Sequence, residues 1–126
     1  MALGGQVPAH ASYVERLDEP GAGYHLVVFG EETKAVGVAA VDGITGTVSS
    51  YARLVDARPQ LPVDAARASE LAGARAITPP RLVWRPCRAS RSMLSPIWEI
   101  RTAGGLIYID QQSQRWAELA PAGPGG

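Results

Sequence analysis

The sequence predicts an α+β fold, with a mostly antiparallel β-sheet of about six or seven strands and one short helix packed on the sheet. Short runs of apolar, β-branched and aromatic residues recur along the chain, as is typical of strands. Gly, Asp and Pro residues separate these runs at the spacing of hairpin turns. Residues 65–72 combine helical periodicity with a capping residue before the helix and a glycine after it.

The first half of the chain is expected to form an antiparallel meander. Residues 13–17 form either a short strand, which we favour, or a short helix that begins with a capping box of Ser12 and Glu15. Strands are expected at 24–29, 35–41 and 47–54, with a hairpin turn at 42–46. Residues 56–62 are broken by prolines and are expected to be a loop.

The second half begins with the helix. Asp64 is the expected N-cap, and Gly73 with the following prolines ends the helix. Its apolar positions are mostly alanine, so it can approach the sheet closely. Four further strands are expected at 81–85, 97–102, 106–110 and 114–119.

Length and composition indicate one domain, covering residues 11–119, between flexible ends at 1–10 and 120–126. The apolar runs have strand length, so no membrane span is expected, and the first residues lack the pattern of a signal peptide, so the expected location is cytoplasmic. A formal net charge of +0 disfavours nucleic acid as a partner.

A similarity between two segments of the chain suggests two related halves, 11–55 and 63–119. Residues 40–48 (AVDGITGTV) and 108–116 (YIDQQSQRW) have the same order of features: the end of a strand, an Asp, turn residues and the start of a new strand. Asp42 then matches Asp110, and Val48 matches Trp116. Both aspartates are expected to serve the turns rather than form a catalytic carboxylate pair. The alternative is that the two hairpins share turn chemistry without being copies.

The stretch 38–48 (VAAVDGITGTV) resembles the last hairpin of a PepSY-type module, in which a helix precedes a small antiparallel sheet. The order of the helix at 65–72 and the strands at 97–119 is similar. This resemblance implies a non-catalytic α+β module that regulates a peptidase or belongs to the cell envelope.

Cys87 is the single cysteine, which excludes an internal disulfide and a cysteine-rich metal site. Arg85 and Arg88 beside it could stabilise a thiolate, which would make a thiol-dependent enzyme. A structural cysteine is the favoured interpretation, because only His10 and His25 could act as a base. No phosphate loop, dinucleotide motif or nucleophile elbow is present, so no cofactor is expected.

The arginines of the 81–91 region are the candidate ligand site. Arg85, Arg88 and Arg91 could bind an anion, since guanidinium groups suit carboxylate and phosphate. The favoured alternative is that these arginines line a solvated strand edge or pair with acidic residues of the first half of the chain. Trp84, Trp98 and Trp116 are expected at core and strand-pair positions, and they are also the candidate interaction aromatics if their rings prove exposed.

The leading functional hypothesis is a non-catalytic binding or regulatory module that acts through protein–protein contact, and we expect a homodimer. The alternatives are a small-ligand or anion-binding protein that uses the 81–91 region, and an enzyme that uses Cys87.

Overall fold

The computed structural model describes residues 8–19, 21–31, 34–58, 61–73 and 75–120. These residues form one α-helix and an eight-stranded sheet, so the α+β class is confirmed and the sheet has more strands than the six or seven expected. The elements are β1 (Pro8–Arg16), β2 (Tyr24–Glu31), β3 (Lys34–Asp42), β4 (Val48–Arg58), α1 (Ala65–Ala72), β5 (Arg81–Trp84), β6 (Ile97–Thr102), β7 (Gly105–Ile109) and β8 (Arg115–Trp116).

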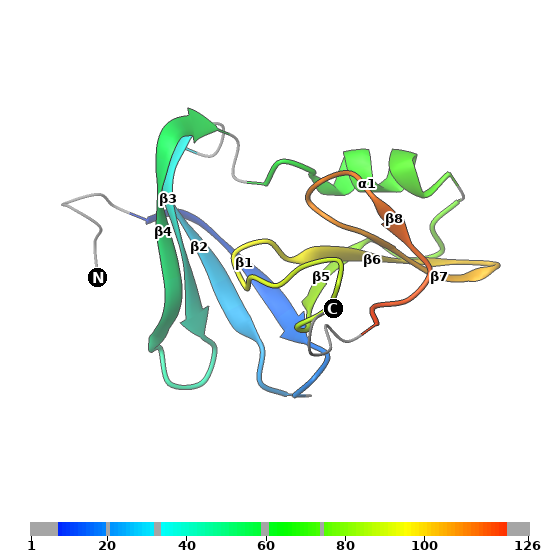
Figure 1. Ribbon diagram of the computed structural model, residues 1–126, viewed down its shortest axis with the longest axis horizontal. Helices are drawn as coiled ribbons and strands as arrows, with labels where there is room; N and C mark the ends of the chain where they lie inside the picture. Colours follow the sequence, from blue (N-terminus) through cyan, green and yellow to red (C-terminus); the bar gives the residue numbers. More distant parts are fainter. Residues whose placement is uncertain (1–7, 20, 32–33, 59–60, 74, 121–126) are drawn as a thin grey trace.

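The sheet consists of two meanders that meet at β1 and β5. The strand order is β4-β3-β2-β1-β5-β6-β7-β8, and every neighbouring pair is antiparallel except β1 and β5. That parallel junction is short, with Glu15 opposite Val83 and Arg16 opposite Trp84. Figure 1 shows β1–β4 on one side of the molecule, and β5–β8 with α1 on the other.

The structure makes residues 13–16 part of a strand, so the helical alternative for this stretch is wrong. Val14 pairs with Tyr24 of β2 and is fully buried, and pairing on both sides of β1 outweighs the local capping pattern. β1 begins at Pro8, within the predicted flexible end, because Pro8 pairs with Phe29. The rest of the two predicted ends, apart from Ala120, lies outside the described residues.

Two other strands differ most from their expected bounds. β4 continues to Arg58, through part of the expected loop, because Arg58 pairs with Ala35 of β3. β8 contains only Arg115 and Trp116 instead of all of 114–119. The chain leaves β7 there, since Leu119 is buried in a separate apolar cluster and the Ala120 carbonyl accepts a hydrogen bond from the Arg88 amide at 3.2 Å.

The helix has the bounds and caps that the sequence predicts. The Asp64 carboxylate accepts a hydrogen bond from the Arg67 amide at 2.8 Å, and Gly73 ends the helix in the left-handed region at φ 67°. Ala68 and Ala72 are fully buried, and α1 contacts β6 and β7. The small side chains let the helix backbone lie close to these strands.

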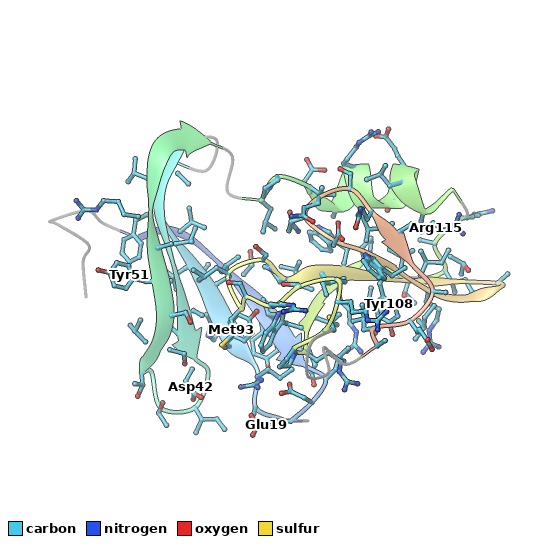
Figure 2. The ribbon with its side chains drawn as sticks, viewed as in Figure 1. Glu19, Asp42, Tyr51, Met93, Tyr108 and Arg115 are labelled. Carbon is cyan, nitrogen blue, oxygen red and sulfur yellow. The ribbon has the colours of Figure 1, made fainter. Side chains whose placement is uncertain are left out.

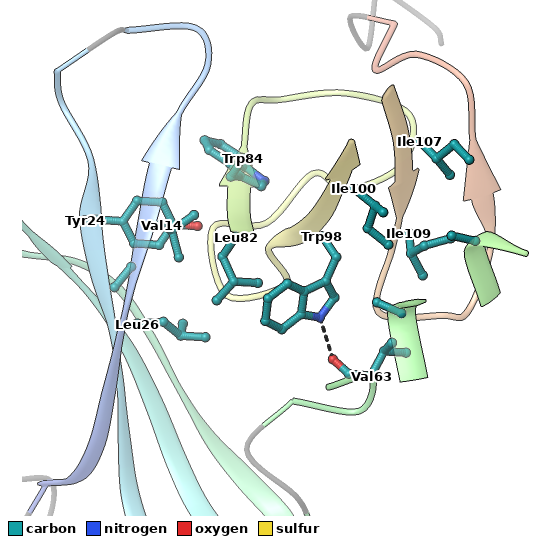
Figure 3. Packing of buried hydrophobic residues seen from close by; sticks show 13 residues of the cluster. Val14, Tyr24, Leu26, Val63, Leu82, Trp84, Trp98, Ile100, Ile107 and Ile109 are labelled. Atoms are coloured by element: carbon teal, nitrogen blue, oxygen red, sulfur yellow. Dashed lines mark hydrogen bonds between the residues drawn. The ribbon is translucent and has the colours of Figure 1, made fainter. Parts of the chain in front are cut away.

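The main hydrophobic core contains residues from both meanders (Figure 3). Tyr24 and Leu26 of β2 lie in the same cluster as Leu82, Trp98 and Ile100. Buried polar groups in it have partners: the Tyr24 hydroxyl donates to the Met93 carbonyl at 2.6 Å, and the Trp98 indole donates to the Val63 carbonyl at 2.8 Å. The core therefore joins the two halves of the sheet, whose direct strand contact is short.

The two aspartate turns use the same chemistry with different lengths. Asp42 Oδ1 accepts from the amides of Ile44 and Thr45, and Asp110 Oδ1 accepts from those of Gln112 and Gln114, all at 2.8–2.9 Å. The Asp42 amide donates to the carbonyl of Thr47, five residues on, whereas the Asp110 amide donates to that of Gln114, four residues on. These bonds support the predicted turn role of both aspartates.

Because the second turn is shorter, the residues of 40–48 and 108–116 do not correspond in the way that the sequence suggests. Val48 pairs with Val41, the residue before Asp42, but Trp116 pairs with Tyr108, two residues before Asp110. The matching of Val48 with Trp116 is therefore wrong by one position.

Candidate functional site

The predicted arginines of the 81–91 region lie in different surroundings. Arg81 Nε donates to Glu99 Oε1 at 2.7 Å, and this ion pair raises the pKa of Arg81. Arg88 and Arg91 are exposed and line a surface depression of about 260 Å³, together with Ser92 and Gln112. The structure thus brings together two of the three arginines predicted to bind an anion.

Arg85 does not line this depression. Its side chain is half-buried, and its Nε atom is buried with no hydrogen-bond partner among the described residues. The hydrogen bond from Arg16 holds the pKa of Asp18 below its usual value, and the charge of Arg85 adds a smaller effect in the same direction. Arg85 therefore lies within electrostatic range of the Arg16–Asp18 pair.

The three tryptophans do not form one aromatic surface. Trp84 and Trp98 are buried in the main core, where the Trp84 indole donates to Ser90 Oγ at 3.3 Å. Trp116 is half-buried, and its indole donates to Asp110 Oδ2 at 2.8 Å. Burial of the first two rings leaves neither available as an exposed interaction aromatic, because their strands pack these positions into the core.

Cys87 lies in a tight turn that excludes solvent. Its amide donates to the Ser90 carbonyl at 3.1 Å, and its thiol lies 3.7 Å from the same oxygen. The side chain has 0% exposure, and it packs against Val83, Ile97 and Leu119. A substrate cannot reach a sulfur in this position without opening the turn.

A cavity of about 620 Å³ lies at the other end of the second meander. It is lined by two exposed arginines, Arg75 and Arg115, and by apolar residues that include Leu106, Ile107 and Trp116. Sequence analysis did not identify this groove, because its arginines are far apart in the chain and carry no motif.

One face of the first meander is open to solvent over part of its area. Strand pairing places Tyr13, His25, Val41 and Val48 in one row across β1–β4. The next row on the same face contains Ala11, Val27, Ala39 and Tyr51. We call these eight residues the open face.

Two tyrosines are the most exposed large side chains of the open face. Tyr13 is 49% and Tyr51 is 60% exposed, and the Tyr13 ring meets the His25 ring edge-on at 5.4 Å. Tyr51 lies on the side of β4 that faces away from the second meander (Figure 2). The opposite face of the same strands carries Val14, Tyr24 and Leu26, which are buried in the core.

Among the described residues, no three His, Cys, Asp or Glu side chains are grouped so that they could hold a metal ion. The described helix is too short to cross a membrane. Comparison of the chain with protein-family models, with curated proteins and with solved structures finds no match.

Proposed function

We propose that this protein is a non-catalytic binding module that acts through protein–protein contact, and that its open face associates with a second copy of the chain. The observation that carries this proposal is the exposure of Tyr13 and Tyr51 on a sheet face whose other members are apolar residues or His25. Exposed aromatic side chains on a flat apolar surface are typical of protein interfaces.

The charge distribution of the open face favours a second copy as the partner. A two-fold interface places the same patch on both subunits, so any formal charge at its centre would face its own copy. The open face contains no Asp, Glu, Lys or Arg. Like-charge repulsion therefore does not oppose self-association at the centre.

Charges of opposite sign bracket the open face. Glu15 follows Tyr13 by two residues on β1, and Arg53 follows Tyr51 by two residues on β4, so strand alternation places both on the side of the open face. A two-fold axis that exchanges the ends of the patch brings Glu15 of one copy towards Arg53 of the other. This arrangement gives the dimer two charge pairs at its rim.

Sedimentation equilibrium at about 50 μM tests the dimer, with a dissociation constant in the micromolar range expected for a standard interface. Tyr51→Ser should weaken association about tenfold or more, because a tyrosine anchor is lost. Ile44→Ser is the matched control, since Ile44 is 78% exposed but lies in the turn between β3 and β4. A monomeric wild-type protein, or an equal loss in both variants, would contradict the proposal.

A charge exchange tests the orientation of the two copies. Glu15→Arg and Arg53→Glu should each weaken the dimer, and the double variant should recover most of the lost affinity. Absence of recovery would refute the pairing of these two residues, while a dimer that still depends on Tyr51 would leave the open face as the interface.

Other features support a non-catalytic role. Cys87 has no exposed surface, which disfavours the alternative hypothesis of an enzyme that uses the Cys87 thiol. The order of α1 and β6–β8 agrees with the PepSY-like resemblance, which implies a regulatory module. That resemblance, the two related halves and the cytoplasmic location stay predictions.

Anion binding at Arg88 and Arg91 is the second candidate function. The depression that these side chains line supports it. The hydroxyl of Ser90 on its wall is already engaged, since it donates towards the carbonyls of Ser92 and Ser95 and accepts from Trp84. Two exposed guanidinium groups alone provide only weak, salt-sensitive binding.

A further inference from the structure

The groove at Arg75 and Arg115 exists because β8 stops early. β8 pairs only with Tyr108 and Ile109 of β7, and the chain then turns away at Ala117. Among the described residues, the first residues of β7 consequently have no strand partner on that side. The cavity of about 620 Å³ lies at this place, and its volume is within the usual range for small-molecule sites.

The exposed edge of β7 offers backbone hydrogen-bonding groups to the groove. Thr102 and Gly105 close the β6–β7 hairpin, and Ile107 pairs with Ile100. In an antiparallel ladder, alternate residues direct their N–H and C=O groups to opposite sides. The Leu106 backbone therefore points away from β6, towards the side where β8 no longer runs.

The groove combines positive charge with an apolar floor. Arg75 and Arg115 line it, and neither has an ion pair with another described residue. Strand pairing and alternation place Arg115 and the buried Ile107 on the α1 side of the β7 edge, and Trp116 and Leu106, which is 40% exposed, on the other side, so the groove runs across this edge. No carboxylate is among the lining residues, so the two positive charges are not neutralised within the groove.

Arg115 also lies near the end of α1. A test of ligand binding must therefore separate the effect of Arg115 on stability from its effect on affinity. The Arg115 Nη1 atom lies 3.9 Å from the position that a Cβ at Gly73 would occupy, next to the C-terminal end of α1. A positive charge there interacts favourably with the helix dipole. Loss of Arg115 is therefore expected to affect stability as well as any ligand.

We propose that this groove binds a small amphipathic carboxylate, with its charged group held by Arg75 and Arg115 and its apolar body crossing the β7 edge to Leu106 and Trp116. Guanidinium groups form bidentate, charge-assisted hydrogen bonds with a carboxylate. The Leu106 amide points to this side of β7 and is a further donor. The site is independent of the open face, so it does not depend on whether the protein dimerises.

The test is a titration of the ¹⁵N-labelled full chain with octanoate, followed by amide and indole chemical shifts. Octanoate should give saturable shifts at Gly104, Leu106 and the Trp116 indole. Acetate keeps the charge and octan-1-ol keeps the apolar chain, and each should bind about tenfold or more weakly than octanoate. If octan-1-ol binds as tightly as octanoate, the proposed role of the arginines is wrong. If acetate binds as tightly as octanoate, the proposed contact with the apolar side chains is wrong.

Variants locate the site. Arg75→Gln and Arg115→Gln should each weaken octanoate binding about tenfold, whereas Arg67→Gln at an exposed position of α1 should leave its affinity unchanged. Melting temperatures without octanoate report the structural role of Arg115, and Arg115→Lys keeps the charge if Arg115→Gln does not fold. Loss of binding in Arg88→Gln but not in Arg75→Gln would overturn the proposal in favour of the depression at 88–92.

An extended acidic peptide is the competing occupant of the β7 edge. A blocked peptide of alternating valine and glutamate, titrated in the same way, distinguishes it. Saturation by this peptide at Leu106, without saturation by octanoate, would refute the small-molecule proposal.

Discussion

At the scale of single residues, the protein pairs most of its buried polar groups with specific partners. Asp110 is 2% exposed, yet its two carboxylate oxygens accept two backbone amides and the Trp116 indole. Such pairing is needed because a buried polar group without a partner destabilises the folded state. Arg85 Nε is the exception among the described side chains.

Tyr24 is the residue at which pH and stability are most directly linked. Burial raises the pKa of its phenol above the ordinary value of 10.0. The unfolded chain therefore releases this proton first as the pH rises, and the stability contributed by the neutral phenol is complete below pH 10 and is lost above it.

Tyr24→Phe should lower the free energy of unfolding at pH 7 by about 1 kcal/mol, because the hydrogen bond to the Met93 carbonyl is lost. The difference between wild type and variant should shrink above pH 10, where only the wild type has this phenol to ionise on unfolding. Urea unfolding followed by circular dichroism at several pH values measures both effects. A difference that stays constant or grows with pH would contradict the assignment.

At the scale of elements, the ends of strands and helices decide which surfaces are available. β8 ends after two residues because Leu119 and Ala120 are held elsewhere, and this early end exposes the β7 edge and forms the groove. The helix end at Gly73 lies beside Arg115 of the same groove. A change in the way that α1 ends at Gly73 is therefore expected to move Arg115, which is one of the two arginines proposed to bind the ligand.

Asp64→Ala should destabilise the protein by about 1 kcal/mol, because the Arg67 amide loses its capping acceptor. Asp64→Asn keeps an acceptor and should retain most of the stability. Thermal or urea unfolding of the two variants provides the measurement. Equal losses in both would indicate that the charge of Asp64, rather than the cap, is what matters.

At the scale of the whole molecule, the two meanders depend on a shared core. Their direct strand contact contains two residue pairs, but the main cluster includes Val14, Tyr24 and Leu26 from one meander and Leu82 and Trp98 from the other. We therefore expect the protein to unfold in one cooperative transition.

Leu26→Ala tests this cooperativity, because all three tryptophans lie in the second meander and Leu26 lies in the first. The substitution should cost about 2–5 kcal/mol and lower the unfolding midpoint reported by tryptophan fluorescence as much as that reported by far-UV circular dichroism. Ile44→Ala, at an exposed turn position of the first meander, should change neither. A fluorescence midpoint that does not respond to Leu26→Ala would show that the meanders unfold separately.

Much of the local structure could be predicted from the sequence. The helix at 65–72, its caps, the strand at 97–102 and the turn role of Asp42 and Asp110 all follow from neighbouring residues. These features depend on side-chain periodicity and on hydrogen bonds that span a few positions, so the sequence contains their cause.

The candidate sites could not be predicted in this way. The sequence identified arginines within one segment, and the fold separates Arg85 from Arg88 and Arg91. It favoured core positions for the tryptophans, as the structure has for Trp84 and Trp98, but their alternative role as interaction aromatics could not be decided, because burial depends on which strands become neighbours.

The sequence by itself determined the elements of this protein and the chemistry of its turns and caps. The tertiary structure decided that β1 lies parallel to β5, that β8 stops at Trp116, and that Arg75 and Arg115 share one groove. It also decided that the side of β1–β4 bearing Tyr13 and Tyr51 is open over part of its area, while the other side is buried in the core. The physical reason is that pairing between distant strands and burial of their faces depend on contacts between residues far apart in the chain, which local periodicity does not encode.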